Sequence, residues 1–202
     1  MVEAKLGESV MSSLALTDAL LVLSAAFLIY QAHGNIGVRL ASTVLMLAAA
    51  LGVLRFSEWL PLPGPHQFMV TMSSSAAMPL LALALLQRES AIARSRQIAW
   101  VFLIVSATIG LILTAALGIK LYAQAIAVLS VLALIAGMAR RRDWWSTGAG
   151  VCMLLGMILF VSKVSLPGVL VPGDFLHLGI AVGLRMLRPA HPAQRLPVEG
   201  AG

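Results

Sequence analysis

Of the 202 residues in the chain, 60% are hydrophobic and only 11% are charged, whereas about 25% are charged in a typical soluble domain. This composition excludes a soluble globular domain and predicts an integral membrane protein. The net charge of +6 does not indicate nucleic-acid binding, because the basic residues lie in short segments between apolar runs. Cys152 lies inside one of these runs and is interpreted as a packing residue.

Seven apolar segments follow one another, each near the roughly 20 residues that a membrane-spanning helix needs. Because the connections are short, we expect an all-α, polytopic bundle of antiparallel neighbours in a single transmembrane domain, residues 1–188. The Pro-rich end, residues 189–202, is expected to be a disordered cytoplasmic tail. The segments cover about 14–32, 38–59, 66–86, 97–117, 121–139, 144–161 and 170–187.

Lysine and arginine are divided unevenly between the two ends of this expected bundle. Ten of the 14 basic residues fall at one end, including the run from Arg140 to Arg142, and four fall at the other. Because basic residues favour the cytoplasmic side, we expect the N-terminus outside and the C-terminus in the cytoplasm. The membrane is interpreted as a bacterial cytoplasmic (inner) membrane.

Small residues and one proline indicate how the helices pack. Gly179 and Gly183 form a GxxxG pair in the last segment, which favours close packing within the chain over packing between two copies. Pro79 is expected to kink the third segment, because proline removes a backbone donor. The serines of residues 73–75 are expected to bond to carbonyls of their own helix.

Five ionisable residues from four segments fall at a similar depth, near the expected outer face. Asp174 and His177 are three residues apart and therefore share one face of the last helix. Ionisable groups at the edge of the hydrocarbon are costly and are candidates for function. The set consists of Asp18, Glu58, His66, Asp174 and His177.

Imidazoles together with carboxylates are typical of a zinc site, in which three protein ligands leave one position for water. Zinc acidifies this water enough to make it a nucleophile near neutral pH, and a further carboxylate can act as the general base. We therefore expect His66, Asp174 and His177 to be metal ligands and Asp18 and Glu58 to be catalytic.

A structural role is the alternative for each of these residues. Asp174 follows Pro172 and Gly173 and can be the N-cap of the last helix. Glu58 can be a charge at the edge of a loop, or can pair with Arg55. His66 can lie at the membrane interface in contact with water.

The layout of seven helices, with polar groups between the second and third and at the start of the seventh, resembles the alkaline ceramidase and progestin/adiponectin-receptor superfamily of membrane hydrolases. In that superfamily a histidine near the end of the second helix and an HxxxH pair on the seventh hold a zinc ion, with a serine and an aspartate nearby. The resemblance implies that His177 is one seventh-helix ligand, with His66 and Ser57 standing in for the second-helix histidine and the serine. The chain departs from the pattern at Ala181, where the second histidine of the pair would stand.

Three functions fit this pattern. The first is a zinc-dependent hydrolase that acts on a lipid-like or amide substrate among the membrane lipids. The second is a binding or transport protein for a small ligand or ion, although the inner halves of the helices lack polar residues for a path across the membrane. The third is a scaffold or accessory subunit without catalysis, in which the polar layer serves helix registration.

Overall fold

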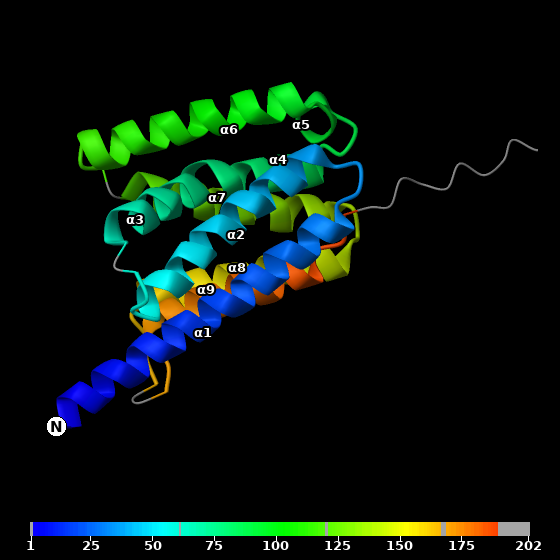
Figure 1. Ribbon diagram of the computed structural model, residues 1–202. Helices are drawn as coiled ribbons and strands as arrows, with labels where there is room; N and C mark the ends of the chain where they lie inside the picture. The colour runs from blue at the N-terminus through cyan, green and yellow to red at the C-terminus, as the bar shows by residue number, and fades with distance from the viewer. Residues whose placement is uncertain (1, 61, 120, 167–168, 190–202) are drawn as a thin grey trace, which may run out of the picture.

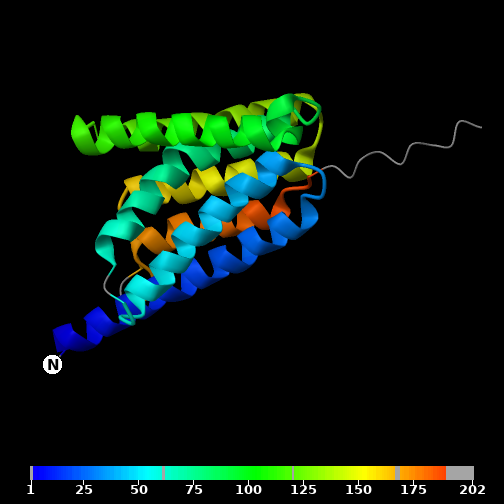
Figure 2. The same ribbon diagram turned by 45° about the horizontal axis from the view of Figure 1, so that its top comes forward.

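The computed structural model describes residues 2–60, 62–119, 121–166 and 169–189, with side chains from residue 13 onward. These residues form helices that run side by side, with α1 and α6 at opposite edges (Figures 1 and 2), and they contain no strand. The elements are α1 (Val2–Gln31), α2 (Ile36–Phe56), α3 (Pro63–Met72), η1 (Ser73–Ala77), α4 (Met78–Leu86), α5 (Ala91–Arg94), α6 (Arg96–Leu111), η2 (Ile112–Ala116), α7 (Leu121–Arg140), α8 (Trp144–Val161) and α9 (Pro172–Met186).

Six helical segments of the described chain are long and apolar enough to cross a membrane. The expected helical membrane bundle is confirmed to this extent. The last helix, α9, has 15 residues, or about 22 Å of length, which is shorter than the roughly 30 Å of hydrocarbon in a bilayer. The six segments are Ser13–Gln31, Ile36–Phe56, Pro63–Leu86, Arg96–Ala116, Leu121–Arg140 and Trp144–Val161.

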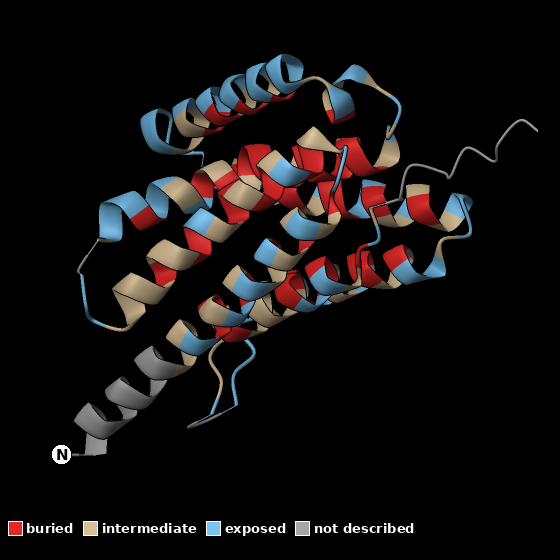
Figure 3. Cartoon of the chain, turned by 45° about the vertical axis from the view of Figure 1, so that its right-hand side comes forward, coloured by how far each residue is buried: buried red, intermediate tan, exposed pale blue. Residues whose placement is uncertain are grey.

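Polarity is distributed as in a protein whose surroundings are apolar. Large aliphatic side chains are exposed along the outer helix faces, while serine, threonine, aspartate and histidine side chains are among the buried residues. Helix α6 illustrates this arrangement, because its buried residues lie on the side that faces the bundle and most of its remaining surface is exposed (Figure 3). An exposed apolar surface of this extent fits contact with lipid.

Some helix boundaries differ from those expected. The second helix ends at Phe56, and the third begins at Pro63, so that His66 lies inside its first turn. The short helix α5 was not expected. Before Pro79 the backbone forms the π-helical turn η1, which accommodates the missing proline donor.

Glycines allow the last two helices to cross closely. A methyl group on Gly179 would lie 2.8 Å from the Cα atom of Gly156, and one on Gly183 would lie 2.8 Å from the carbonyl oxygen of Ala149. Any larger residue would therefore force α8 and α9 apart. The prediction that the GxxxG pair packs within the chain is confirmed.

The turns that join α1 to α2, α4 to α6 and α7 to α8 lie at the same end of the bundle, which we call the arginine end. There the Arg88 Nε and the Arg141 guanidinium donate to carbonyls in the last turn of α4, and Arg88 Nη2 lies 3.8 Å from Asp143 Oδ2. Burial lowers the pKa of Arg88, as does the nearby Arg141, while Asp143 opposes the shift. The polar residues predicted as a site lie at the opposite end.

Candidate functional site

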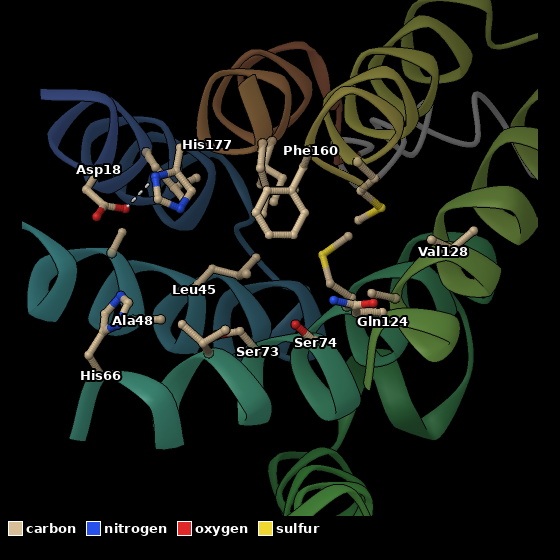
Figure 4. Close-up of a pocket in the computed structure, with 18 of the residues that line it drawn as sticks. Asp18, Leu45, Ala48, His66, Ser73, Ser74, Gln124, Val128, Phe160 and His177 are labelled. Atoms are coloured by element: carbon tan, nitrogen blue, oxygen red, sulfur yellow. Dashed lines mark ion pairs between the residues drawn. The ribbon is translucent and has the colours of Figure 1, made fainter. Parts of the chain in front are cut away.

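A cavity of about 320 Å³ lies toward the opposite end of the bundle, between helices from both halves of the chain (Figure 4). This volume is at the small end of the range for small-molecule sites. Most of the wall is apolar, formed by residues such as Leu45, Met157 and Phe160. Three of the five predicted ionisable residues also line it: Asp18 from α1, His66 from α3 and His177 from α9.

Asp18 and His177 form a buried pair at one end of the cavity. The distance between Asp18 Oδ1 and His177 Nδ1 is 3.1 Å, and the Asp18 side chain is only 2% exposed. The two atoms are at ion-pair distance without the alignment of a hydrogen bond, and Asp18 Oδ2 has no hydrogen-bond partner among the described residues. The pair therefore has hydrogen-bonding capacity that the described protein groups do not use.

The α1–α2 crossing provides the space for the Asp18 carboxylate. A methyl group at Gly52 would lie 2.0 Å from Asp18 Oδ2, so this position of α2 accepts only glycine without a shift of the carboxylate. Asp18 lies in the second turn of the span Ser13–Gln31. A carboxylate at this depth requires a partner or a ligand to offset the loss of hydration.

The free nitrogen of the His177 ring points into the cavity (Figure 4). With Nδ1 beside Asp18, the Nε2 atom is left to interact with whatever occupies the cavity. An imidazole with one nitrogen beside a carboxylate can use the other nitrogen for proton transfer or for hydrogen bonding to a ligand.

His66 is fixed by a different partner. The Arg55 Nη1 atom lies 3.1 Å from His66 Nδ1, and a guanidinium can only donate, so Nδ1 is the acceptor. A neutral His66 then carries its proton on Nε2 and is a donor there. The ring also packs edge-to-face against Phe56, with a distance of 5.6 Å between the ring centroids.

Asp174 caps the last helix, as the structural alternative predicted, but from the third residue of the helix and not from the N-cap position. The N-cap of α9 is Val171, and Asp174 is the third residue of the helix, where its carboxylate accepts from the backbone N–H of Val171 at 2.8 Å. It also accepts from Ser13 Oγ and Thr17 Oγ1, each at 2.9 Å. Three donors therefore occupy this carboxylate, and two of them, Ser13 and Thr17, join α9 to α1.

Glu58 lies in the exposed turn after α2, with a φ of 62°, and does not line the cavity. The predicted layer thus divides into three environments. Asp18, His66 and His177 meet at one cavity, Asp174 is in a helix interface, and Glu58 faces the surroundings.

The predicted metal ligands do not fit a zinc ion in this arrangement. Among the described residues, no three histidine, cysteine, aspartate or glutamate side chains lie close enough together to hold a metal. Both oxygens of Asp174 already accept hydrogen bonds. His66 is beside the positive charge of Arg55, which opposes a cation at that ring.

Several residues of the cavity were not expected from the sequence. Gln67, Ser73, Ser74 and Gln124 contribute uncharged polar groups to its wall. The buried Ser73 Oγ has no hydrogen-bond partner among the described residues, while Ser75 Oγ donates to Thr71 O at 2.7 Å, as expected for this serine run. Gln124 is a polar residue in the first turn of the fifth apolar segment, and this position was a signal that could have indicated it.

Comparison with known proteins found no matching protein-family model, no matching curated protein and no matching solved structure. The resemblance to the ceramidase and adiponectin-receptor superfamily stays a prediction.

Proposed function

We propose that this multi-pass membrane protein binds a lipid-like amphiphile in the cavity, with a hydroxyl or carboxyl group of the ligand held by Asp18 and His177. The observation that carries the proposal is the buried Asp18–His177 pair, whose Nε2 atom faces a mostly apolar cavity (Figure 4). An apolar wall with a few convergent polar groups is the usual form of a small-molecule site.

The chemistry of the two histidines indicates the kind of polar group. His66 presents a donor at Nε2, because Arg55 occupies its other nitrogen. His177 presents a donor or an acceptor at Nε2, depending on which ring nitrogen carries the proton. A hydroxyl or a protonated carboxyl group can both donate and accept and can therefore pair with either form.

The walls of the cavity also indicate an apolar portion of the ligand. Phe160 and Val161 of α8 and Val70 of α3 are cavity residues that are also exposed on the helix surface. They mark an opening through which a hydrocarbon chain can extend toward lipid. An amphiphile from the surrounding membrane can reach the cavity by this route without crossing a polar barrier.

We further propose that α9 completes a seven-span bundle with the N-terminus outside and the C-terminus in the cytoplasm, in a bacterial cytoplasmic (inner) membrane. The support is the concentration of arginines at one end of the bundle. This orientation puts the cavity nearer the outer leaflet.

Direct binding to protein in lipid nanodiscs tests the proposal. Radiolabelled oleyl alcohol and oleic acid should bind, and 1-octadecene, which has no polar group, should bind at least tenfold more weakly. Asp18→Ala and His177→Asn should each remove this preference, while Glu58→Gln should keep it. Equal binding of the three probes by the wild-type protein, or an unchanged preference in both cavity variants, would overturn the proposal.

The zinc-dependent hydrolase stays a prediction from the sequence. Metal analysis of the purified protein after zinc loading tests it independently of the probes. One zinc per chain that is lost in both His66→Ala and His177→Ala would support it, whereas no retained zinc would reject it.

A further inference from the structure

A second cavity adjoins the first and has a different chemical character. It has a volume of about 550 Å³ and lies among four elements: α3, η1, η2 and the first turn of α7. All of its lining residues are uncharged, and five carry hydrogen-bonding side chains: Gln67, Thr71, Ser74, Thr114 and Gln124.

The two cavities share part of their walls. Gln67, Val70, Ser74 and Gln124 line both of them. In Figure 4, Ser74 and Gln124 lie at the far end of the first cavity from Asp18 and His177. A ligand whose polar end is at Asp18 and His177 can therefore reach the second cavity with another part of its chain.

The hydrogen-bonding groups of the second cavity are available to a ligand. Thr71 Oγ1 donates to Gln67 O at 3.1 Å, and Thr114 Oγ1 donates to Gly110 O at 2.6 Å, so both hydroxyl oxygens can still accept. Within the described part of the chain, the side-chain amides of Gln67 and Gln124 make no hydrogen bond. Each amide can both donate and accept.

We infer that the second cavity binds a neutral hydroxyl or amide group located along the chain of the same amphiphile. The absence of charged groups among its lining residues favours a neutral group over a carboxylate, a phosphate or an amine, because burying an unpaired charge is far more costly than burying a hydroxyl. This inference rests on the proposed function and makes the ligand an amphiphile with two separated polar groups.

The backbone beside this cavity is unusual, since a π-helical turn lies on each side of it. The turn η1 interrupts the third span, and η2 forms the end of the fourth. Ser75 of η1 packs against Gly110, where a methyl group would lie 2.1 Å from its Oγ atom. Turns of this type are frequent at functional sites. Here they widen the two helices where the second cavity lies.

A series of hydroxy fatty acids tests the inference. Octadecanoic acid and its derivatives with one hydroxyl at carbon 3, 6, 9 or 12 are compared for binding to the wild-type protein in nanodiscs. At least one derivative should bind about tenfold more tightly than the unsubstituted acid, as one or two added hydrogen bonds predict. The double variant Gln67→Leu/Gln124→Leu should lose this gain, measured as the ratio of the affinities for the hydroxy acid and for octadecanoic acid in the same protein.

The control is Gln97→Leu, which makes the same change on the exposed arginine end of α6 and should keep the gain. If octadecanoic acid binds in an Asp18-dependent manner but no hydroxyl position improves binding, the inference fails while the proposed function stands. A gain that survives the double variant also overturns the inference. If no acid binds, the proposed function fails and the inference with it.

Discussion

Asp18 and Asp174 are two buried aspartates at the same end of the bundle, one on each of two contacting helices, and they differ in their hydrogen bonds. The carboxylate of Asp174 accepts from three donors. That of Asp18 has one oxygen near His177 and another without a hydrogen-bond partner among the described residues. Depth alone therefore does not distinguish a structural carboxylate from one available to a ligand; the number of hydrogen bonds already made does.

The contrast has energetic consequences. A buried carboxylate with all its donors in place stabilises the fold, and removing it leaves those donors without their acceptor. A buried carboxylate with an unused oxygen costs free energy in the folded state. Such a group is expected where it binds a ligand. Substitution of Asp174 should therefore mainly lower stability, whereas substitution of Asp18 should mainly lower ligand binding.

The largest effect is expected from Asp174→Ala. This change removes the acceptor for Thr17, for the Val171 backbone N–H and for Ser13, and with it the polar connection between α1 and α9. The free energy of unfolding should fall by about 3 kcal/mol, the sum expected for a lost cap and two hydrogen bonds between the helices, one buried and one part-buried. Reversible unfolding in mixed micelles measures it. A loss below about 0.5 kcal/mol would contradict the structural role of Asp174.

A smaller effect is expected from Gly52→Ala, which acts on the other aspartate. The new methyl group would overlap Asp18 Oδ2, so the carboxylate must move, at a cost of roughly 1–3 kcal/mol in stability and about tenfold in probe affinity. The double variant Asp18→Ala/Gly52→Ala should recover the stability.

The matched control is Gly64→Ala, because no atom lies within 4 Å of a methyl group at Gly64. It should change neither stability nor binding. Simple additivity of the Asp18→Ala and Gly52→Ala effects would show that the two residues do not share one space.

The smallest effect is expected from Glu58→Gln. The side chain is exposed and lies outside both cavities, so stability should stay within about 0.5 kcal/mol of the wild type and oleic acid binding should not change. Titration of this variant beside the wild type measures both quantities. A tenfold loss of oleic acid binding would show that Glu58 belongs to the site predicted from the sequence.

The sequence was sufficient for the parts of the fold that depend on local composition. Apolar runs of spanning length predicted the helices, and the spacing of Gly179 and Gly183 predicted their close packing within the chain. The extent of α1 before its apolar run, the helix α5 and the π-helical turns depend on packing and were not predicted.

The candidate site was predicted less completely. Depth along the helices brought Asp18, His66 and His177 together, and the structure has all three at one cavity. Depth could not separate Asp174, because its partner Thr17 is 157 residues away in the sequence. It also could not show that Gln124 faces the cavity, because the rotation of a helix about its own axis is set by tertiary contacts.

A ligand held by Asp18 and His177 is best tested by native mass spectrometry of the protein released from membranes without added probes. The proteins to compare are the wild type, Asp18→Ala and Glu58→Gln. A bound amphiphile is expected on the wild type and on Glu58→Gln, and it should be lost from folded Asp18→Ala. The same adduct at the same occupancy in all three proteins would contradict a ligand held by Asp18 and His177.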